Sequence, residues 1–290
     1  MPTPQELRTP TSPDDLAQAE EIYRRWGCFI ATDLIPAELL RQLQGEIQGL
    51  LRLALSRSAA AGRQDATPAP RFDEGYLRLC ADDPAWADAV FAACRRLPTS
   101  HQLSGHPALL RLSRRLMGSE TIMSNPYRPV RIDSPQRQEY LLPWHQDYPF
   151  WPIDQPRALS CWLALDDVTA ESGAMLFMPG AHRDGEDPPV DFLRASKDWG
   201  DRSPAARSVP ILAGSCVFHH CLSWHMSPPN ATSGQRRALI AILMDAESRW
   251  DPAHSGWHPM NELVTVAPGE CVAALVNLLV NAIDAMPSGG

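Results

Sequence analysis

Three polar side chains in two distant segments of the sequence are of types that bind metal ions. His145 and Asp147 stand two positions apart in the otherwise apolar and aromatic run LLPWHQDYPFW. Burial of a carboxylate without a partner is costly, so either this run opens to water or a cation lies beside Asp147. If the run is a β-strand, residues two apart point to the same face, and His145 and Asp147 can bind one metal ion together.

The third side chain is His225, in the later run FHHCLSWHMSPPNATSGQRRALIAIL. We expect a strand that ends at His225, a turn through Pro228 and Pro229, and a returning strand that begins with arginine. Such a hairpin places Arg236 beside the strand that carries His225. Two histidines and one carboxylate on one side of a metal leave three positions open, as in non-haem Fe(II) oxygenases. The guanidinium can then hold the far carboxylate of a dicarboxylic acid in a two-pronged salt bridge.

Other polar residues compete for these roles. His219 and His220 precede His225 and are possible ligands. Arg237 should point to the face opposite Arg236 and form a surface contact or an ion pair. His182 follows a glycine turn, where a hydrogen-bonded structural histidine is the expected role. Asp166 and Asp167 end a predicted strand and are typical of a turn.

Aromatic residues surround the candidate metal ligands in the sequence. We expect at least half of them to be ordinary core residues, and the remainder to line an apolar substrate pocket. They are Trp144, Tyr148, Phe150, Trp151 and Trp162.

The composition favours a small-molecule partner. The chain has 290 residues, a formal net charge of -8 and a pI near 5.6, and it has no block of basic residues. Nucleic acid and anionic membrane surfaces are therefore not expected partners. Its seven cysteines include no CxxC pair, and no apolar run approaches the roughly 18 residues of a membrane span. These features predict a cytoplasmic protein with reduced thiols.

The pattern of elements predicts a single domain, residues 1–290, of the mainly β class with flanking helices. Residues 1–119 form a mainly helical flank, 120–250 a jelly-roll core with an insertion at 182–208, and 251–290 a C-terminal helix that packs on the sheet or forms a homo-oligomer contact. Ser12 is a suitable N-cap for the first helix. The loop expected at 56–70 is small, polar and proline-containing. Helices are predicted near 13–26, 36–55, 83–97 and 106–118, and strands near 28–35, 121–132, 139–147, 158–165, 174–181, 209–225 and 237–245.

Four motifs in this order resemble the phytanoyl-CoA dioxygenase family of Fe(II)- and 2-oxoglutarate-dependent oxygenases. They are EEIYRRWGCFIATDLIPAELLRQLQGEI near the start, WHQD at 144–147, WLALDDVTAESGAMLFMPGAHR at 162–183 and WHMSPPNATSGQRRA at 224–238. The resemblance covers most of the chain. It implies a double-stranded β-helix, that is, a cupin-like jelly roll.

The resemblance also implies a role for each matching residue. It makes His145, Asp147 and His225 the iron ligands, and Arg236 the partner of the distal carboxylate of 2-oxoglutarate. Ser227, two positions after His225, is implied as a supplementary hydrogen-bond donor to that carboxylate. A further polar residue from an earlier strand often helps to hold 2-oxoglutarate in the family, and Arg128, Arg131 and Gln138 are candidates.

The activity implied is oxidation of a small molecule with Fe(II), 2-oxoglutarate and dioxygen, by hydroxylation or oxidative ring closure, in secondary metabolism such as antibiotic biosynthesis. Related halogenases replace the carboxylate ligand with a small residue, so Asp147 argues against halogenation. Three alternatives remain open: an acyl-CoA hydroxylase, a non-catalytic jelly-roll binding protein, and a hydrolytic zinc enzyme, in which Arg236 would have no obvious role.

Overall fold

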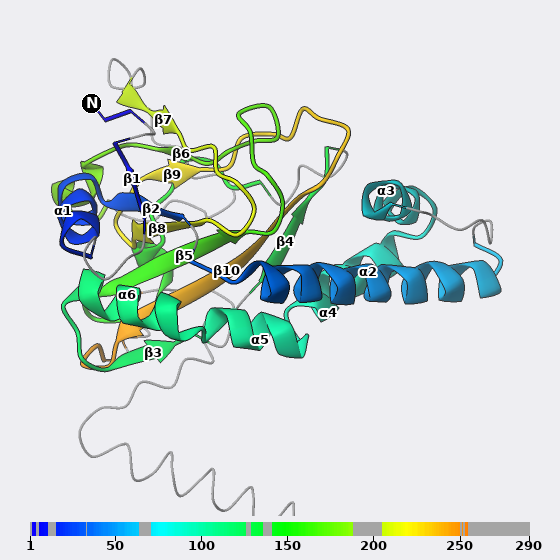
Figure 1. Cartoon of the computed structure of the whole chain (residues 1–290), viewed down its shortest axis with the longest axis horizontal. Coiled ribbons are helices and arrows are strands. Elements are labelled where there is room, and N and C mark those ends of the chain that lie inside the picture. Colours follow the sequence, from blue (N-terminus) through cyan, green and yellow to red (C-terminus); the bar gives the residue numbers. More distant parts are fainter. Residues whose placement is uncertain are drawn as a thin grey trace, which may run out of the picture.

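Two β-sheets face each other, and helices cover the outer face of the larger one (Figure 1). The structure is a computed structural model that describes residues 2–3, 6–10, 16–32, 34–63, 71–125, 129–135, 141–187, 205–249, 251 and 253–254. All pairings between neighbouring strands are antiparallel except that of β1 with β2. This is the double-stranded β-helix that the sequence predicts.

The large sheet has the order β1-β2-β8-β5-β10-β3, and β4 also pairs with β10. Its strands are β1 (Arg8–Pro10), β2 (Cys28–Thr32), β3 (Ile122–Ser124), β4 (Val130–Asp133), β5 (Ala158–Ala164), β8 (Cys216–His220) and β10 (Arg236–Asp245). The small sheet has the order β7-β6-β9 and consists of β6 (Leu176–Phe177), β7 (Arg207–Ser208) and β9 (His225–Met226).

The central strand β5 shows how the large sheet separates its two faces. All seven of its residues are buried. Ser160 and Trp162 alternate with Leu159, Cys161 and Leu163, and successive side chains of a strand point to opposite faces. The aliphatic and thiol side chains pack in the main core with the helices. The opposite face of β5 carries the hydroxyl of Ser160 and the indole ring of Trp162.

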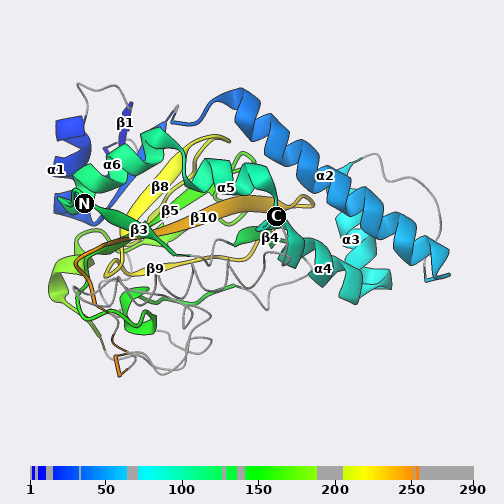
Figure 2. The same cartoon turned by 90° about the horizontal axis from the view of Figure 1, so that it is seen from below.

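The helices form one layer (Figure 2). They are α1 (Leu16–Trp26), α2 (Ala37–Ala60), α3 (Phe72–Asp82), α4 (Pro84–Cys94), α5 (Pro98–Ser104) and α6 (Pro107–Met117), with the 3-10 turns η2 (Tyr148–Phe150) and η3 (Ala181–Asp184). In α2, Leu43, Ile47 and Leu51 recur on one side of the helix and are fully buried. Burial of one such side chain contributes about 1.5–3 kcal/mol, which fixes this helix against the core.

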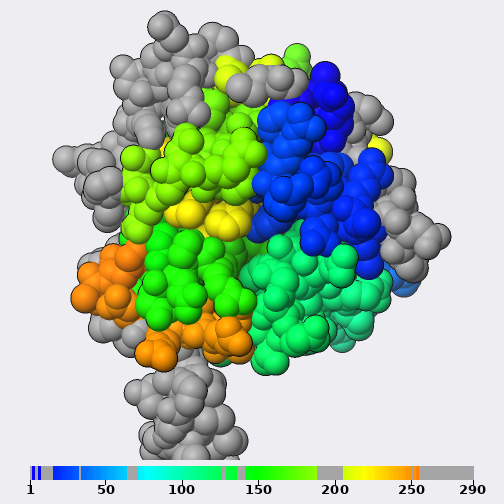
Figure 3. All heavy atoms as spheres, turned by 90° about the vertical axis from the view of Figure 1, so that its left-hand side faces the viewer, coloured from blue at the N-terminus to red at the C-terminus, as the bar shows by residue number. Residues whose placement is uncertain are grey.

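The first helix links the helical layer to the segment that precedes the insertion. Figure 3 shows α1, in blue, between α6 and the yellow-green segment that leads to η3. The N–H group of Gly180 donates to the carbonyl of Trp26 at 2.9 Å. Gly27 follows α1 with a φ of 76°, and a Cβ there would lie 2.5 Å from Nδ1 of His182. Only glycine fits this junction.

Most predicted helices are confirmed, with a correction at the loop expected at 56–70. Residues 56–60, expected to begin a loop, continue α2 instead, because Leu55 and Ser58 stay buried on its inner side. Residues 64–70 of that loop lie outside the described residues, as do Ser12, the stretch 188–204 of the insertion and the C-terminal tail from 255. Helices α3 and α5 were not predicted.

Two predictions about strands are wrong. The described part of the segment 139–147 is irregular and has only one isolated β-bridge, at His145. The expected hairpin between the strands of His225 and Arg236 is also absent from the described residues. Instead β9 belongs to the small sheet and β10 to the large one, so the proline-containing link crosses between sheets.

Candidate metal centre

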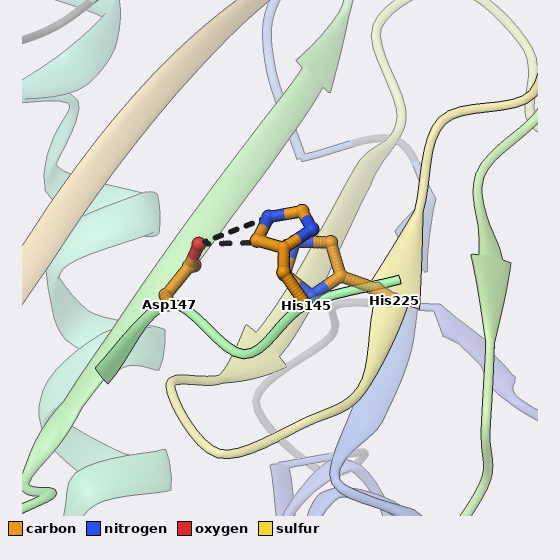
Figure 4. A group of neighbouring side chains, drawn as sticks. All are labelled: His145, Asp147 and His225. Carbon is orange, nitrogen blue, oxygen red and sulfur yellow. Dashed lines mark ion pairs between the residues drawn. The ribbon is translucent and has the colours of Figure 1, made fainter. Parts of the chain in front are cut away.

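Side chains of His145, Asp147 and His225 converge between the two sheets (Figure 4). Each offers one ligand atom, and these atoms all lie within 4.8 Å of one another. Nε2 of His145 lies 3.6 Å from Oδ1 of Asp147, and Nε2 of His225 lies 3.8 Å from the same oxygen. Three donors at these separations can surround a single metal ion.

Backbone hydrogen bonds hold the ligand segments together. The N–H group of His145 donates to the carbonyl of His225 at 3.0 Å, and the N–H group of His225 donates back at 3.0 Å. The N–H group of Asp147 donates to the carbonyl of Cys221 at 3.0 Å. The convergence therefore comes from this bridge between the two segments, and not from the strand alternation predicted for His145 and Asp147.

The imidazole rings present the nitrogen that a metal needs. Nδ1 of His145 lies 2.7 Å from the carbonyl of Pro143, and Nδ1 of His225 lies 2.9 Å from the carbonyl of Ser223. A carbonyl only accepts, so each Nδ1 carries the hydrogen and each Nε2 is the nitrogen that can bind a metal. Histidine ligands of metals are oriented in this way in other proteins.

Charge at the site also suits a cation. Burial opposes ionisation of Asp147, but the imidazoles of His225, His145 and His219 outweigh it and hold the pKa of the carboxyl below its usual range. Burial, together with the neighbouring His145 and His219, lowers the pKa of His225 well below its usual value. At neutral pH the site thus combines a carboxylate with a neutral imidazole at His225, the forms that bind a metal.

The competing histidines separate onto the two faces of β8. His219 faces the site: its ring centroid is 4.4 Å from that of His225, and its Nδ1 is 3.9 Å from Oδ2 of Asp147. His220 faces the helical layer, where Nδ1 accepts a hydrogen bond from the N–H group of Leu222 and burial lowers its pKa to about 4. His182 lies on that side too, with Nε2 3.2 Å from the carbonyl of Arg24, in keeping with a structural role.

Arg236 is fully buried and only partly paired. Its Nε and Nη2 donate to the same oxygen of Asp133, Oδ2, at 3.2 and 2.8 Å. The other oxygen of Asp133 accepts from Nη2 of Arg131 at 2.7 Å. Nη1 of Arg236 has no hydrogen-bond partner among the described residues. The fork expected to grip a ligand with two prongs therefore has one buried donor left.

Gly173 makes room for that donor. Its φ is 87°, and a Cβ there would lie 2.8 Å from Nη1 of Arg236 and 2.6 Å from the carbonyl oxygen of Pro228. The ring of Trp162 flanks the guanidinium, with its centroid 6.0 Å from Cζ. Burial lowers the pKa of Arg236 and the charge of Asp133 opposes that shift.

The remaining predicted contacts are described in part. Ser227 is buried, and its N–H group donates to the carbonyl of Leu142 at 3.1 Å. Of the three candidates for a further co-substrate contact, Arg131 is bound to Asp133, whereas Arg128 and Gln138 lie outside the described residues.

The neighbouring aromatic residues are mostly core residues, as expected. Trp144 is half-buried and packs beside Met178 and Trp224. The other four are buried: Tyr148, Phe150, Trp151 and Trp162. The outward Arg237 forms the predicted ion pair, with Asp166 as its partner.

Three residues that position the site were missed from the sequence. Asp133 holds Arg236, and Ser160 donates to Oδ2 of Asp147 at 2.8 Å. Gln146 donates to the carbonyls of Gly185 and Leu222, at 2.8 and 2.9 Å. Available signals were a lone serine inside the apolar strand ALSCWLA and an amide between two candidate ligands.

Two histidines and one carboxylate with converging ligand atoms, on a double-stranded β-helix, are typical of mononuclear non-haem iron oxygenases. A family profile described as Phytanoyl-CoA dioxygenase (PhyH) matches residues 23–238, well over half of the chain. The chain belongs to this family. It is a 2-oxoglutarate-dependent non-haem iron dioxygenase that uses Fe(II), 2-oxoglutarate and dioxygen.

Relatives and solved structures agree with this assignment. Ectoine dioxygenase of Bordetella bronchiseptica is 23% identical over 271 residues, which cover 86% of this chain and 82% of the relative. The epimerase SnoN, solved with Fe3+, alpha ketoglutarate and nogalamycin RO, has a TM-score of 0.62 at 22% identity and covers 88% of this chain and 94% of SnoN. The carbocyclase SnoK from nogalamycin biosynthesis has a TM-score of 0.57 at 20% identity, covering 92% and 94%. The two structures share the fold.

No helix in the described part of the chain combines the length and the apolar character needed to cross a bilayer.

Proposed function

We propose that the protein oxidises a small molecule of secondary metabolism and that His145, Asp147 and His225 bind its Fe(II). Arg236 and Ser227 bind the distal carboxylate of 2-oxoglutarate. The observation that supports this most strongly is the convergence of three ligand atoms within 4.8 Å, with both histidine Nδ1 atoms already committed to carbonyl groups.

Each side chain has a defined task in this proposal. Fe(II), when bound with 2-oxoglutarate and dioxygen, supplies the oxidising power that removes hydrogen from the substrate. His145 and His225 donate lone pairs from Nε2, and Asp147 adds the charge that offsets the metal. Nη1 of Arg236 donates to the distal carboxylate and gains the partner that it lacks.

The proposed substrate class is a polar or bulky secondary metabolite, modified by hydroxylation or oxidative ring closure. The names of three similar proteins support it: one oxidises ectoine, and two belong to nogalamycin biosynthesis. An acyl-CoA substrate has less support, because the chain is acidic overall and coenzyme A phosphates favour basic clefts.

The test is formation of succinate from 2-oxoglutarate under Fe(II) and air. The purified full chain is assayed against a panel of amino acids, glycosylated polyketides and one branched acyl-CoA. We expect substrate-stimulated succinate with a member of the first two groups and complete dependence on His145. His145→Ala is compared with His101→Ala, which removes an exposed histidine of α5.

The outcomes separate the alternatives. Loss of turnover in His145→Ala but not in His101→Ala supports the metal assignment. Equal turnover in both variants contradicts it. Stimulation by the acyl-CoA alone moves the substrate class to thioesters. Zinc-dependent hydrolysis of a panel member, with no succinate formed, indicates a hydrolase.

We also propose that the protein acts in the cytoplasm. The described cysteines support this, since none of the following forms a disulfide: Cys28, Cys94, Cys161, Cys216 and Cys221.

A further inference from the structure

The candidate ligand Asp147 stands on a backbone that does little to orient it. It precedes the 3-10 turn η2 with φ -76° and ψ -40°, outside any strand. The last torsion of an aspartate is broad, so a carboxylate on such a backbone turns unless hydrogen bonds hold it. The N–H group of Asp147 donates to the carbonyl of Cys221 and its carbonyl accepts from the N–H group of Phe150, but neither backbone contact fixes the carboxylate.

The large sheet provides the missing constraint through Ser160. This serine lies in the middle of β5, is 3% exposed, and donates its hydroxyl to Oδ2 of Asp147 at 2.8 Å. An ionised carboxylate only accepts, so the direction of this hydrogen bond is fixed. His219 stands directly opposite Ser160 in the register of β5 and β8, and its ring lies on the same side of the sheet.

The two oxygens of Asp147 are thereby divided. Oδ2 faces the sheet, where Ser160 holds it and Nδ1 of His219 is 3.9 Å away, too far for a hydrogen bond. Oδ1 faces both histidine Nε2 atoms. A bidentate carboxylate would consume one of the three coordination positions that the co-substrate and dioxygen need.

We propose that Ser160 is a positioning residue that turns Asp147 so that the carboxylate meets the metal through Oδ1 alone. This rests on the proposed function of His145, Asp147 and His225. Ser160 touches neither the metal nor the co-substrate. It acts by holding Oδ2, the oxygen that is not a ligand. The carboxylate of Asp147, which lies outside any strand, is in this way positioned by the central strand β5.

A purely structural serine would behave differently. Ser113 in α6 is also fully buried, and its hydroxyl donates to the carbonyl of Leu109 at 2.9 Å. Ser113→Ala removes an equally buried hydroxyl that bonds only within α6, so it is a matched control for the loss of stability. Ser160→Thr retains a hydroxyl on the same strand position.

The experiment measures metal binding by the full-length apoprotein without oxygen. Co(II) is titrated while its visible absorption is recorded, for the wild type, Ser160→Ala, Ser160→Thr and Ser113→Ala, and thermal unfolding is followed in parallel. Loss of a hydrogen-bond partner behind a ligand typically lowers metal affinity 10–100-fold. We expect a loss of about that size in Ser160→Ala, partial recovery in Ser160→Thr and wild-type affinity in Ser113→Ala.

His145→Ala separates a failure of the proposed metal site from a failure of the proposed role of Ser160. If it binds Co(II) like the wild type, the proposed metal site itself is wrong. If it fails to bind while Ser160→Ala retains the affinity and the spectrum of Ser113→Ala, the metal site stands and the role of Ser160 is refuted. A lower affinity with an altered spectrum in Ser160→Ala supports the inference.

Discussion

Two consecutive arginines at the start of β10 lie on opposite faces of the large sheet and make contrasting ion pairs. Arg237 meets Asp166 fork to fork, with Nε on Oδ2 at 2.8 Å and Nη2 on Oδ1 at 2.6 Å. Arg236 directs two nitrogens to one oxygen of Asp133, Oδ2, while Arg131 donates to both oxygens of the same carboxylate. The outer pair is complete, whereas the inner one leaves Nη1 unpaired among the described residues.

Under the proposed function, this difference separates an ion pair that only stabilises the fold from one whose arginine also binds the co-substrate. The side chains of Arg237 and Asp166 are 12% and 23% exposed, so water shares in their solvation. Those of Arg236 and Asp133 are 1% and 3% exposed. A buried donor without a partner costs free energy, and a bound carboxylate would recover that cost.

The largest expected effect is on stability when the inner acid is neutralised. Asp133→Asn removes the counter-ion that the buried Arg236 shares with the part-buried Arg131 and should lower the free energy of unfolding by about 3–5 kcal/mol. Asp166→Asn should cost about 1 kcal/mol, since exposure screens the outer pair. Urea unfolding of both variants measures the difference. Equal losses in the free energy of unfolding would show that the greater burial of the inner ion pair does not raise its contribution to stability.

The next effect concerns co-substrate binding. Arg236→Gln should weaken 2-oxoglutarate binding by roughly 10–100-fold, since a hydrogen bond to a charged group contributes about 1.5–3 kcal/mol. Arg237→Gln should leave the affinity unchanged because its guanidinium is on the far face. Calorimetric titration of the Co(II)-loaded protein compares the two variants. A similar loss in both would contradict the division of roles.

An effect of similar size, but on the stability of the fold, is expected from the glycine beside Nη1. Gly173→Ala must strain a positive φ and also displace the guanidinium or the carbonyl of Pro228, so it should destabilise the fold by about 2–3 kcal/mol. Gly62→Ala has a φ of 70° but no atom within 4 Å, and should cost about 1 kcal/mol. Thermal unfolding ranks the two. Equal melting temperatures would mean that Arg236 and the carbonyl of Pro228 move aside for a methyl group at little cost in free energy.

The smallest effect is a pH dependence. Burial opposes ionisation of Asp133, but Arg131 and Arg236 outweigh it and hold the pKa of the carboxyl below its usual value. Its stabilising contribution is therefore present above pH 3.8 and is lost as the pH falls further. The stability gap between wild type and Asp133→Asn should narrow below pH 3.8. A constant gap down to the acid transition would argue against a depressed pKa.

The sequence predicts the fold class and the main helices because both depend on periodic patterns. Apolar residues recur with helical spacing in α2. Six of the seven segments predicted as strands contain strands of the two sheets. The break of the expected strand at 139–147 could not be foreseen, since its ordering depends on hydrogen bonds to Cys221 and His225 from a distant segment.

The site residues also divide into those that local sequence patterns reveal and those that depend on contacts made in the fold. His145, Asp147, His225 and Arg236 were found because their types and spacing match one kind of chemistry, and the structure brings the first three together. Asp133 was missed because nothing local marks a residue whose partner is 103 positions away, and Ser160 was missed because a lone serine in an apolar strand does not show which group it holds. Their roles depend on the strand register that aligns β5 with β8 and β4 with β10.

The outermost strand of the large sheet has a practical consequence for handling the protein. Strand β1 pairs with β2 through residues 8–10, and Leu7 just before it is fully buried. Trimming the chain past this point would expose the backbone of a wholly apolar strand, Cys28 to Ala31. Unprotected strand edges of this kind recruit other chains. Truncated forms should therefore self-associate, and solubility tags are better attached ahead of Leu7 than in place of it.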